Sequence, residues 1–102
     1  PIPPNAPAFT LAPDWVCEIL SPRTSSRDRG VKRVAYFKAG VGHYWLIDPI
    51  EGTLEVLRRE ANGYLIVATA VRGEKLRAEP FEELELDLDE LLGPDPNAPP
   101  AP

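Results

Sequence analysis

The residue that first suggests chemistry is Glu18, which stands inside the apolar run WVCEIL at residues 15–20. That run has the β-branched, aromatic and aliphatic content of a buried strand. An ionised carboxylate in such surroundings costs several kcal/mol unless a cation, a proton or strong hydrogen-bond donors compensate it. The pattern therefore indicates a site at which Glu18 meets a positively charged partner.

The partner has to come from another part of the chain. Asp14 shares a strand face with Glu18, but four residues of strand separate them by roughly 13 Å, too far for both to bind one metal ion. Farther along, Asp28, Lys32 and Tyr36 recur at helical spacing on one stripe. Because a helix that follows a strand packs back over it, we expect Lys32 to reach Glu18. The other residues of this set are candidates for supporting roles: Asp14, Asp28 and Tyr36.

A carboxylate that meets a lysine in this way is the minimum equipment for hydrolysing a phosphodiester. In that reading Glu18 binds Mg²⁺, and the amine of Lys32 steadies the nucleophile or the developing negative charge. A structural alternative stays open, in which Lys32 forms an ion pair with Asp28 inside the helix and Tyr36 packs beside them. The spacing alone does not choose between the two.

Charge is distributed unevenly along the chain, although the net charge is only −5. Residues 23–38 hold six bases and one acid, whereas residues 79–90 hold seven acids and no base. A local basic stretch can attract a polyanion even when the net charge is negative. Arg23, Arg27 and Arg29 are therefore candidates for contacts with nucleic-acid phosphates. The alternative is a solvated helix face, and the acidic run at 82–90 is expected to form a solvated rim.

The first elements of the chain predict a crossover between parallel strands. We expect a strand at 15–21, a helix that is capped by Ser25 or Ser26 and ends at Gly40, and a second strand at 43–49. A strand, a helix and a strand in this order almost always form a right-handed crossover, and the two strands then run parallel.

The strands that follow are expected to pair antiparallel. Asn62-Gly63 separates runs at 53–60 and 64–71, and it supplies the positive φ that a tight hairpin turn needs. A short strand near 75–78 follows, and LELDLDELL at 84–92 fits either an alternating strand or a short helix. The prediction is an α/β (α+β) fold with a mixed β-sheet, in which a strand–helix–strand crossover precedes antiparallel hairpin strands.

Length and composition limit the chain to one small domain with proline-rich ends. Nine of the 13 prolines lie at the ends of the 102 residues, so we expect an extended lead-in at 1–9 and a disordered tail at 93–102. The chain begins at Pro1 and contains no methionine, which predicts that upstream sequence is missing. With neither a long apolar run nor a signal peptide, we expect a cytoplasmic protein with no membrane partner.

A resemblance to a known family covers nearly the whole of the expected folded body. It is carried by residues 13–49, PDWVCEILSPRTSSRDRGVKRVAYFKAGVGHYWLIDP, which closely resemble the Uma-two family of restriction-endonuclease-like proteins, a branch of the PD-(D/E)XK nuclease superfamily. The resemblance runs from about Phe9 to Leu92. It implies that residues 10–92 are the C-terminal part of a restriction-endonuclease-like domain.

The resemblance also implies cleavage of DNA with the help of Mg²⁺ or Mn²⁺. In the superfamily, one strand supplies an aspartate and the next supplies an acid two positions before a lysine. Glu18 falls at the acidic position as the metal ligand, whereas Leu20 stands at the lysine position. Lys32 is the expected substitute and, with Glu18, the expected catalytic residue. The aspartate is expected in a strand upstream of this chain.

Two alternatives to an endonuclease stay open. The chain could be a catalytically inactive nucleic-acid-binding module of the same fold, or a self-assembling module whose hairpin at 53–71 pairs with another copy. DNA and a second copy, in a homodimer, are the expected partners. Tyr44 and Trp45 are expected in the core or at an interface, and His43 is expected in a structural role.

Overall fold

The computed structural model describes residues 14–23 and 26–98. Its elements in chain order are β1 (Trp15–Ile19), α1 (Ser26–Ala39), β2 (His43–Asp48), β3 (Thr53–Glu60), β4 (Gly63–Val71), β5 (Lys75–Leu76), β6 (Leu86–Asp87) and α2 (Leu88–Leu92). The predicted lead-in at 1–9, the candidate cap Ser25 and residues 99–102 of the predicted tail lie outside the described ranges. Neither described helix is long and apolar enough to span a membrane.

The first four strands form one mixed sheet in the order β1-β2-β3-β4. β1 pairs with β2 in parallel, whereas β3 pairs antiparallel with both β2 and β4. The predicted crossover and the predicted hairpin are thereby confirmed. β2 ends at Asp48, one residue before its predicted end, because Pro49 has no N–H to donate to the ladder.

Helix α1 connects the two parallel strands. It begins at Ser26 and ends at Ala39. Gly40 has a φ of 83°, a left-handed conformation that glycine adopts without strain, and the next N–H, that of Val41, donates to the carbonyl of Tyr36 at 3.1 Å. The predicted stop at Gly40 is therefore confirmed, and it turns the chain back toward the start of β2.

The hairpin turn differs from the prediction in one respect. Glu60 pairs with Gly63, so Ala61 and Asn62 form a two-residue loop. Gly63 has a φ of 149°, and among the described residues no other type than glycine has a positive φ. Asn62 therefore does not share the positive φ that the Asn-Gly pair was expected to supply, and Gly63 alone provides it.

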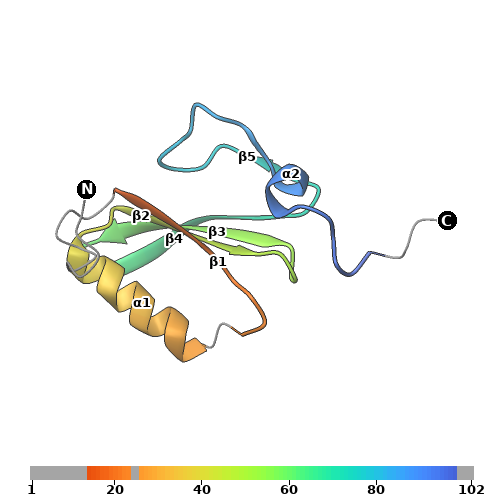
Figure 1. The fold of residues 1–102 in the computed structure, drawn as a ribbon. Coiled ribbons are helices and arrows are strands. Elements are labelled where there is room, and N and C mark those ends of the chain that lie inside the picture. Colours follow the sequence, from red (N-terminus) through yellow and green to blue (C-terminus); the bar gives the residue numbers. More distant parts are fainter. Residues whose placement is uncertain (1–13, 24–25, 99–102) are drawn as a thin grey trace, which may run out of the picture.

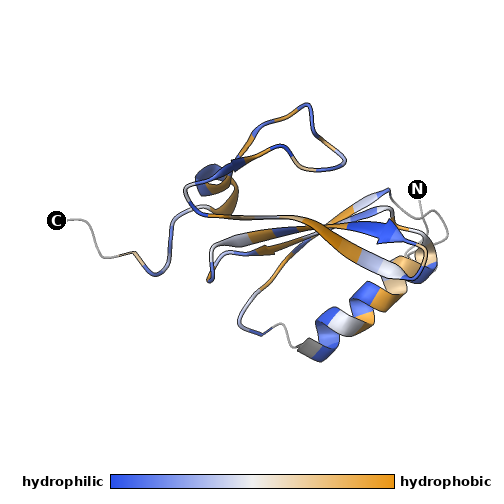
Figure 2. Cartoon of the chain, turned by 180° about the vertical axis from the view of Figure 1, so that it is seen from behind, coloured by the Kyte–Doolittle hydropathy of each residue, from blue (hydrophilic) through white to orange (hydrophobic). Residues whose placement is uncertain are grey.

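The sheet is covered on both sides. Helix α1 packs on one face, which we call the α1 face, and the C-terminal segment from β5 to α2 covers the opposite face, the back face (Figures 1 and 2). Alternation along β2 sends Tyr44 and Leu46 to the α1 face and Trp45 and Ile47 to the back face. The core therefore consists of two clusters that share the sheet as their common wall.

The aromatic residues divide between these two faces. The tyrosines of the chain, Tyr36, Tyr44 and Tyr64, lie on the α1 face. The ring of Tyr44 is in edge contact with the other two, at centroid distances of 5.1 and 5.6 Å. Both tryptophans, Trp15 and Trp45, lie on the back face with their rings 5.3 Å apart.

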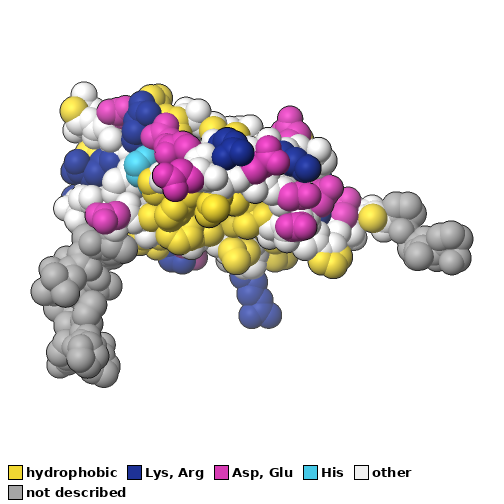
Figure 3. Space-filling view, turned by 90° about the horizontal axis from the view of Figure 1, so that it is seen from above, with side chains coloured by type: hydrophobic (Ala, Val, Ile, Leu, Met, Phe, Trp, Pro, Cys, Tyr) yellow, Lys and Arg dark blue, Asp and Glu magenta, His cyan; other side chains and the backbone are white. Residues whose placement is uncertain are grey.

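Glu79 fastens the C-terminal segment to the back face. Its Oε1 lies 3.0 Å from Nε2 of His43, and its Oε2 accepts a bond of 3.0 Å from Nη1 of Arg58. The indole N–H of Trp45 donates a hydrogen bond of 2.8 Å to the backbone carbonyl of Glu79. Figure 3 looks onto this side of the molecule, where acidic side chains lie around an apolar area and beside the histidine.

The last described residues follow this segment. β5 and β6 pair antiparallel and α2 follows β6 directly, so residues 84–92 form both a short strand and a short helix. Beyond α2, Nη1 of Arg72 donates to the carbonyl of Gly93 at 2.7 Å, and Nδ2 of Asn97 donates to that of Ile50 at 2.7 Å. Gly93 and Asn97, which belong to the predicted disordered tail, are therefore hydrogen-bonded to the folded body.

Candidate active site

The backbone of Glu18 is held in strand β1, and its side chain lies on the α1 face of the sheet. In the ladder it lies opposite Leu46 of the buried strand β2. Two residues farther on, the N–H of Leu20 donates to the carbonyl of Ile47 at 2.8 Å. Backbone groups alternate in direction along a parallel strand, so Glu18 directs its own backbone groups toward β2 as well. Its side chain is only 11% exposed, which makes it an acid held nearly buried beside α1.

Lys32 reaches Glu18 from the second turn of α1. Its Nζ lies 2.9 Å from Oε1 of Glu18, and its side chain is 52% exposed. The hydrogen bond to Glu18 and the negative charge of that residue raise the pKa of Lys32, and Asp28 contributes less. The structure thus brings together the acid of β1 and the amine of α1 that the spacing of the sequence singles out.

Tyr44 is a contact of Glu18 that the sequence analysis missed. Its hydroxyl donates a hydrogen bond of 2.9 Å to Oε2 of Glu18, and its side chain is fully buried. Burial, followed by the bond to Glu18, raises the pKa of Tyr44 far above its usual range. Alternation along β2 puts Tyr44 on the α1 face, but the register of β1 against β2 was needed to find the contact.

Aromatic and basic side chains surround the Tyr44 ring. Tyr36, a predicted supporting residue, is half-buried with its ring 5.1 Å from that of Tyr44, and burial raises its pKa. Tyr64 contacts the same ring at 5.6 Å, and the guanidinium of Arg33 lies 6.0 Å from its centroid. Three neighbours therefore hold the ring that carries the hydroxyl.

The two other acids predicted to support the site occupy different positions. Asp14 is exposed and directly precedes β1, so strand geometry keeps it roughly 13 Å from Glu18. Its carbonyl accepts a bond of 3.1 Å from the N–H of His43, at the start of the parallel ladder. Asp28 lies in the first turn of α1 and is exposed, on the same helix stripe as Lys32.

The three arginines predicted to contact phosphates gather where β1 leads into α1. Arg23 follows β1 and is exposed, Arg27 lies exposed in the first turn of α1, and Arg29 is half-buried. Lys32 follows Arg29 by about one helical turn. The start of α1 therefore carries positive charge on the approach to the Glu18–Lys32 pair.

Glu18 is the acid beside Lys32 that could bind a divalent metal ion. A carboxylate oxygen is the ligand type that Mg²⁺ and Mn²⁺ prefer, and Mg²⁺ is often held by one or two carboxylates together with water and substrate phosphates. Glu18 fits that role. Within residues 14–23 and 26–98, no three His, Cys, Asp or Glu side chains come together as a metal site. Glu18 is therefore not part of a cluster of three such ligands within these residues.

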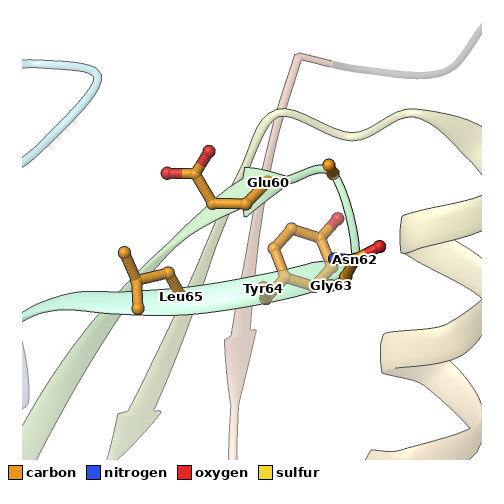
Figure 4. A pocket seen from close by; sticks show the side chains of 6 residues that line it. Glu60, Asn62, Gly63, Tyr64 and Leu65 are labelled. Atoms are coloured by element: carbon orange, nitrogen blue, oxygen red, sulfur yellow. The ribbon is translucent and has the colours of Figure 1, made fainter.

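Two hollows of the surface lie away from this pair. One of about 490 Å³ is at the tip of the β3–β4 hairpin, where Glu60, Asn62, Tyr64 and Leu65 help to line it (Figure 4). The other, of about 220 Å³, lies between α1 and the same turn, with Phe37 in its wall. Neither is lined by Glu18 or Lys32. Of the pair, Lys32 is the member that meets solvent, with 52% of its side chain exposed.

Comparisons with known proteins identify relatives of this chain. The family model described as "Uma2: Putative restriction endonuclease" matches residues 3–89. Among solved structures, the chain is similar to a "putative nuclease belonging to DUF820" from Anabaena variabilis ATCC 29413, with 34% sequence identity and a TM-score of 0.57. The match covers 79% of this chain and 44% of that chain. A search of curated proteins gave no match.

The family match includes all four strands of the sheet and the crossover helix between β1 and β2. The similar crystal structure supports the same assignment, because its match covers most of this chain, although this chain spans less than half the length of that relative. The mixed sheet is therefore of the restriction-endonuclease-like type, and the chain belongs to the Uma2 family.

Proposed function

We propose that this chain contributes the catalytic acid and lysine of a DNA endonuclease that depends on Mg²⁺ or Mn²⁺. The observation that carries the proposal is the distance of 2.9 Å between Oε1 of Glu18 and Nζ of Lys32 in a chain of the Uma2 family. A nearly buried carboxylate beside a partly exposed ammonium suits a reaction in which negative charge develops on a phosphate.

Each of the two residues has a defined task in this proposal. Glu18 is the metal ligand, since its carboxylate stands on a rigid strand beside the solvent-facing side of the pair. When bound, the ion polarises the phosphodiester and lowers the pKa of the attacking water. Lys32 stays protonated because Glu18 raises its pKa, so its ammonium stabilises the developing charge and does not act as a base.

DNA is the proposed substrate, and the start of α1 is the proposed contact surface. Arg23 and Arg27 are exposed there, and Arg29 is half-buried beside them. Contacts with phosphates fix the register of a protein on DNA without reading its sequence. We therefore assign these arginines to positioning of the DNA backbone and not to recognition of bases.

The proposal is tested with supercoiled plasmid and the full-length protein that contains this chain. Cleavage is expected with Mg²⁺ or Mn²⁺ and is expected to stop when EDTA is added. Glu18→Gln and Lys32→Met should each slow cleavage by about 10²-fold or more. Cleavage at the wild-type rate by either variant would refute the assignment of that residue.

Matched controls distinguish the effect of losing a site residue from the effect of losing a charge elsewhere on the protein. Glu85→Gln and Lys75→Met change exposed residues of the C-terminal segment, on the opposite side of the sheet from α1. Both control proteins should cleave plasmid at the wild-type rate. Thermal unfolding of all four variants then shows whether a slow variant is still folded.

A second candidate function is a nucleic-acid-binding module that does not cleave. The observation that favours it is that both carboxylate oxygens of Glu18 already accept bonds, from Lys32 and from Tyr44. A purely structural ion pair has the same appearance. In that case the wild-type protein binds DNA, Arg27→Ala lowers the salt dependence of binding by about one phosphate contact, and no divalent ion produces cleavage.

Three broader predictions belong to the same proposal. We propose that residues 10–92 are the C-terminal part of a larger domain, supported by the 44% of the similar nuclease that this chain spans.

We also propose a cytoplasmic location and a homodimer. The uncharged strand β4 at one edge of the sheet supports the homodimer. Sedimentation of the full-length protein tests the dimer.

A further inference from the structure

Each carboxylate oxygen of Glu18 has its own hydrogen-bond donor, and the two donors differ in chemistry. The neutral hydroxyl of Tyr44 donates to Oε2 at 2.9 Å, and the ammonium of Lys32 lies 2.9 Å from Oε1. The terminal torsion of a glutamate side chain is broad, so the plane of an unheld carboxylate rotates easily. A donor that cannot move removes that freedom.

The Tyr44 hydroxyl is such a donor. The side chain is fully buried, and its ring is in edge contact with Tyr36 at 5.1 Å and with Tyr64 at 5.6 Å. In the β1–β2 ladder Tyr44 lies opposite Val16, two residues before Glu18, so the two side chains are diagonal neighbours on one face. Lys32, in contrast, is half exposed on a long flexible stem.

We propose that Tyr44 is a positioning residue, whose hydroxyl holds Oε2 of Glu18 so that Oε1 is the oxygen presented to cations. In this structure the cation at Oε1 is the ammonium of Lys32. The inference rests on the proposed function, in which a divalent ion also uses Glu18. Tyr44 does not contact the substrate, and it acts through the orientation of the acid.

A hydroxyl suits this task better than a charged group. A phenol is a neutral donor, and the hydroxyl of Tyr44 is buried and donates to Oε2 of Glu18 at 2.9 Å. A neutral donor also leaves the negative charge of Glu18 in place for Lys32 and for a metal ion. Outer partners of metal ligands commonly set affinity in this way, and their removal weakens metal binding by about 10- to 100-fold.

The test compares two substitutions that each delete one hydroxyl from the same aromatic cluster. Tyr44→Phe removes the bond to Glu18, whereas Tyr64→Phe removes a bond of 2.7 Å to the carbonyl of Val41. Both keep the ring and its packing. In the full-length protein at neutral pH, the ion pair with Glu18 is followed through the NMR chemical shift of the Lys32 side-chain amine, and binding of Mn²⁺ is measured by titration without DNA.

Tyr44→Phe is expected to change the NMR chemical shift of the Lys32 amine, because the orientation of its partner carboxylate changes, and to weaken Mn²⁺ binding by about tenfold or more. Tyr64→Phe should leave both quantities at their wild-type values. If the two variants behave alike, or if Tyr44→Phe changes neither quantity, the positioning role is overturned. A wild-type protein that neither binds Mn²⁺ nor cleaves DNA overturns the nuclease instead, and the chemical shift of the Lys32 amine still decides the role of Tyr44.

A further measurement covers the case in which Tyr44→Phe does not fold. In the wild-type protein, a buried hydroxyl bonded to Glu18 should give a slowly exchanging phenolic proton in the NMR spectrum. Glu18→Gln should shift that signal, and Glu85→Gln should not. A Tyr44 proton that exchanges rapidly, or that ignores the change at Glu18, contradicts the proposal.

Discussion

Nζ of Lys32 lies 2.9 Å from Oε1 of Glu18, although one residue belongs to helix α1 and the other to strand β1. The pair is therefore tertiary, and it forms only when the helix has docked on the sheet. Glu18 raises the pKa of Lys32 more than the helical neighbour Asp28 does. This ranking gives the first prediction.

Removal of the charge at Glu18 should lower the pKa of Lys32. The bond to Glu18 is the largest cause that raises this pKa, so Glu18→Gln should bring it down toward the ordinary value for lysine. Asp28→Asn should produce a smaller decrease, and Glu85→Gln none. NMR titration of the lysine amines measures all three. A larger decrease in Asp28→Asn would favour the ion pair within the helix.

Glu79 should make the unfolding free energy depend on acidic pH. The hydrogen bond with His43, followed by the bond from Arg58, lowers the pKa of Glu79 below its ordinary value of about 4.5. Its stabilising contribution is therefore complete above pH 4.5 and is lost as the pH falls toward the lower pKa of the folded state. Wild-type stability should decrease more steeply over this range than that of Glu79→Gln.

The measurement is chemical unfolding at several pH values between about 6 and 3. Glu82→Gln changes a nearby exposed acid and serves as the control, with the wild-type pH dependence expected. Equal slopes for the wild type and Glu79→Gln would show that Glu79 does not fasten the C-terminal segment in solution.

The C-terminal segment should stabilise the sheet through α2. Leu88 is fully buried in the back-face cluster, whereas Leu84, four residues earlier, is 60% exposed. Leu88→Ala should therefore lower the unfolding free energy by about 2–5 kcal/mol, because it leaves a cavity. Leu84→Ala should change it by about 0.5 kcal/mol or less. Urea denaturation measures both, and equal effects would mean that α2 is not packed on the sheet.

Two glycines of the crossover should respond in opposite directions to alanine. Gly40 has a φ of 83°, where a Cβ is strained, so Gly40→Ala should destabilise the protein by about 1 kcal/mol. Gly30 lies inside α1 with nothing within 4 Å of an added Cβ, so Gly30→Ala should stabilise it by about 0.5–1 kcal/mol. Thermal unfolding of the two variants gives the signs directly, and shifts of the same sign would contradict this account of the crossover.

The crossover could be predicted from the sequence because its signals are local. Helical spacing, the stop at Gly40 and the strand that ends before Pro49 each depend on a few neighbouring residues. The approach of Lys32 to Glu18 then follows, because a helix that connects two parallel strands must pack on their sheet. Local sequence signals thus predict the helix and the strands, and the connection between them predicts the Glu18–Lys32 pair.

The contact between Tyr44 and Glu18 could not be predicted in the same way. It depends on the register of two parallel strands whose partners are far apart in the sequence, and a shift by one residue would turn Tyr44 to the other face. The attachment of Glu79 to His43 is equally non-local. The contacts of Glu79 were not predicted, because the solvated rim was expected only for the acidic run at 82–90.

The division of the aromatic residues gives each side of the sheet its own chromophore. Both indoles of the chain lie beneath the C-terminal segment, and all the phenols lie beneath α1. Emission excited only through tryptophan therefore reports the loss of one cover, and tyrosine absorbance reports the loss of the other. If the two optical melting curves separate, α1 and the C-terminal segment leave the sheet one after the other. If the curves coincide, both leave the sheet in a single cooperative step.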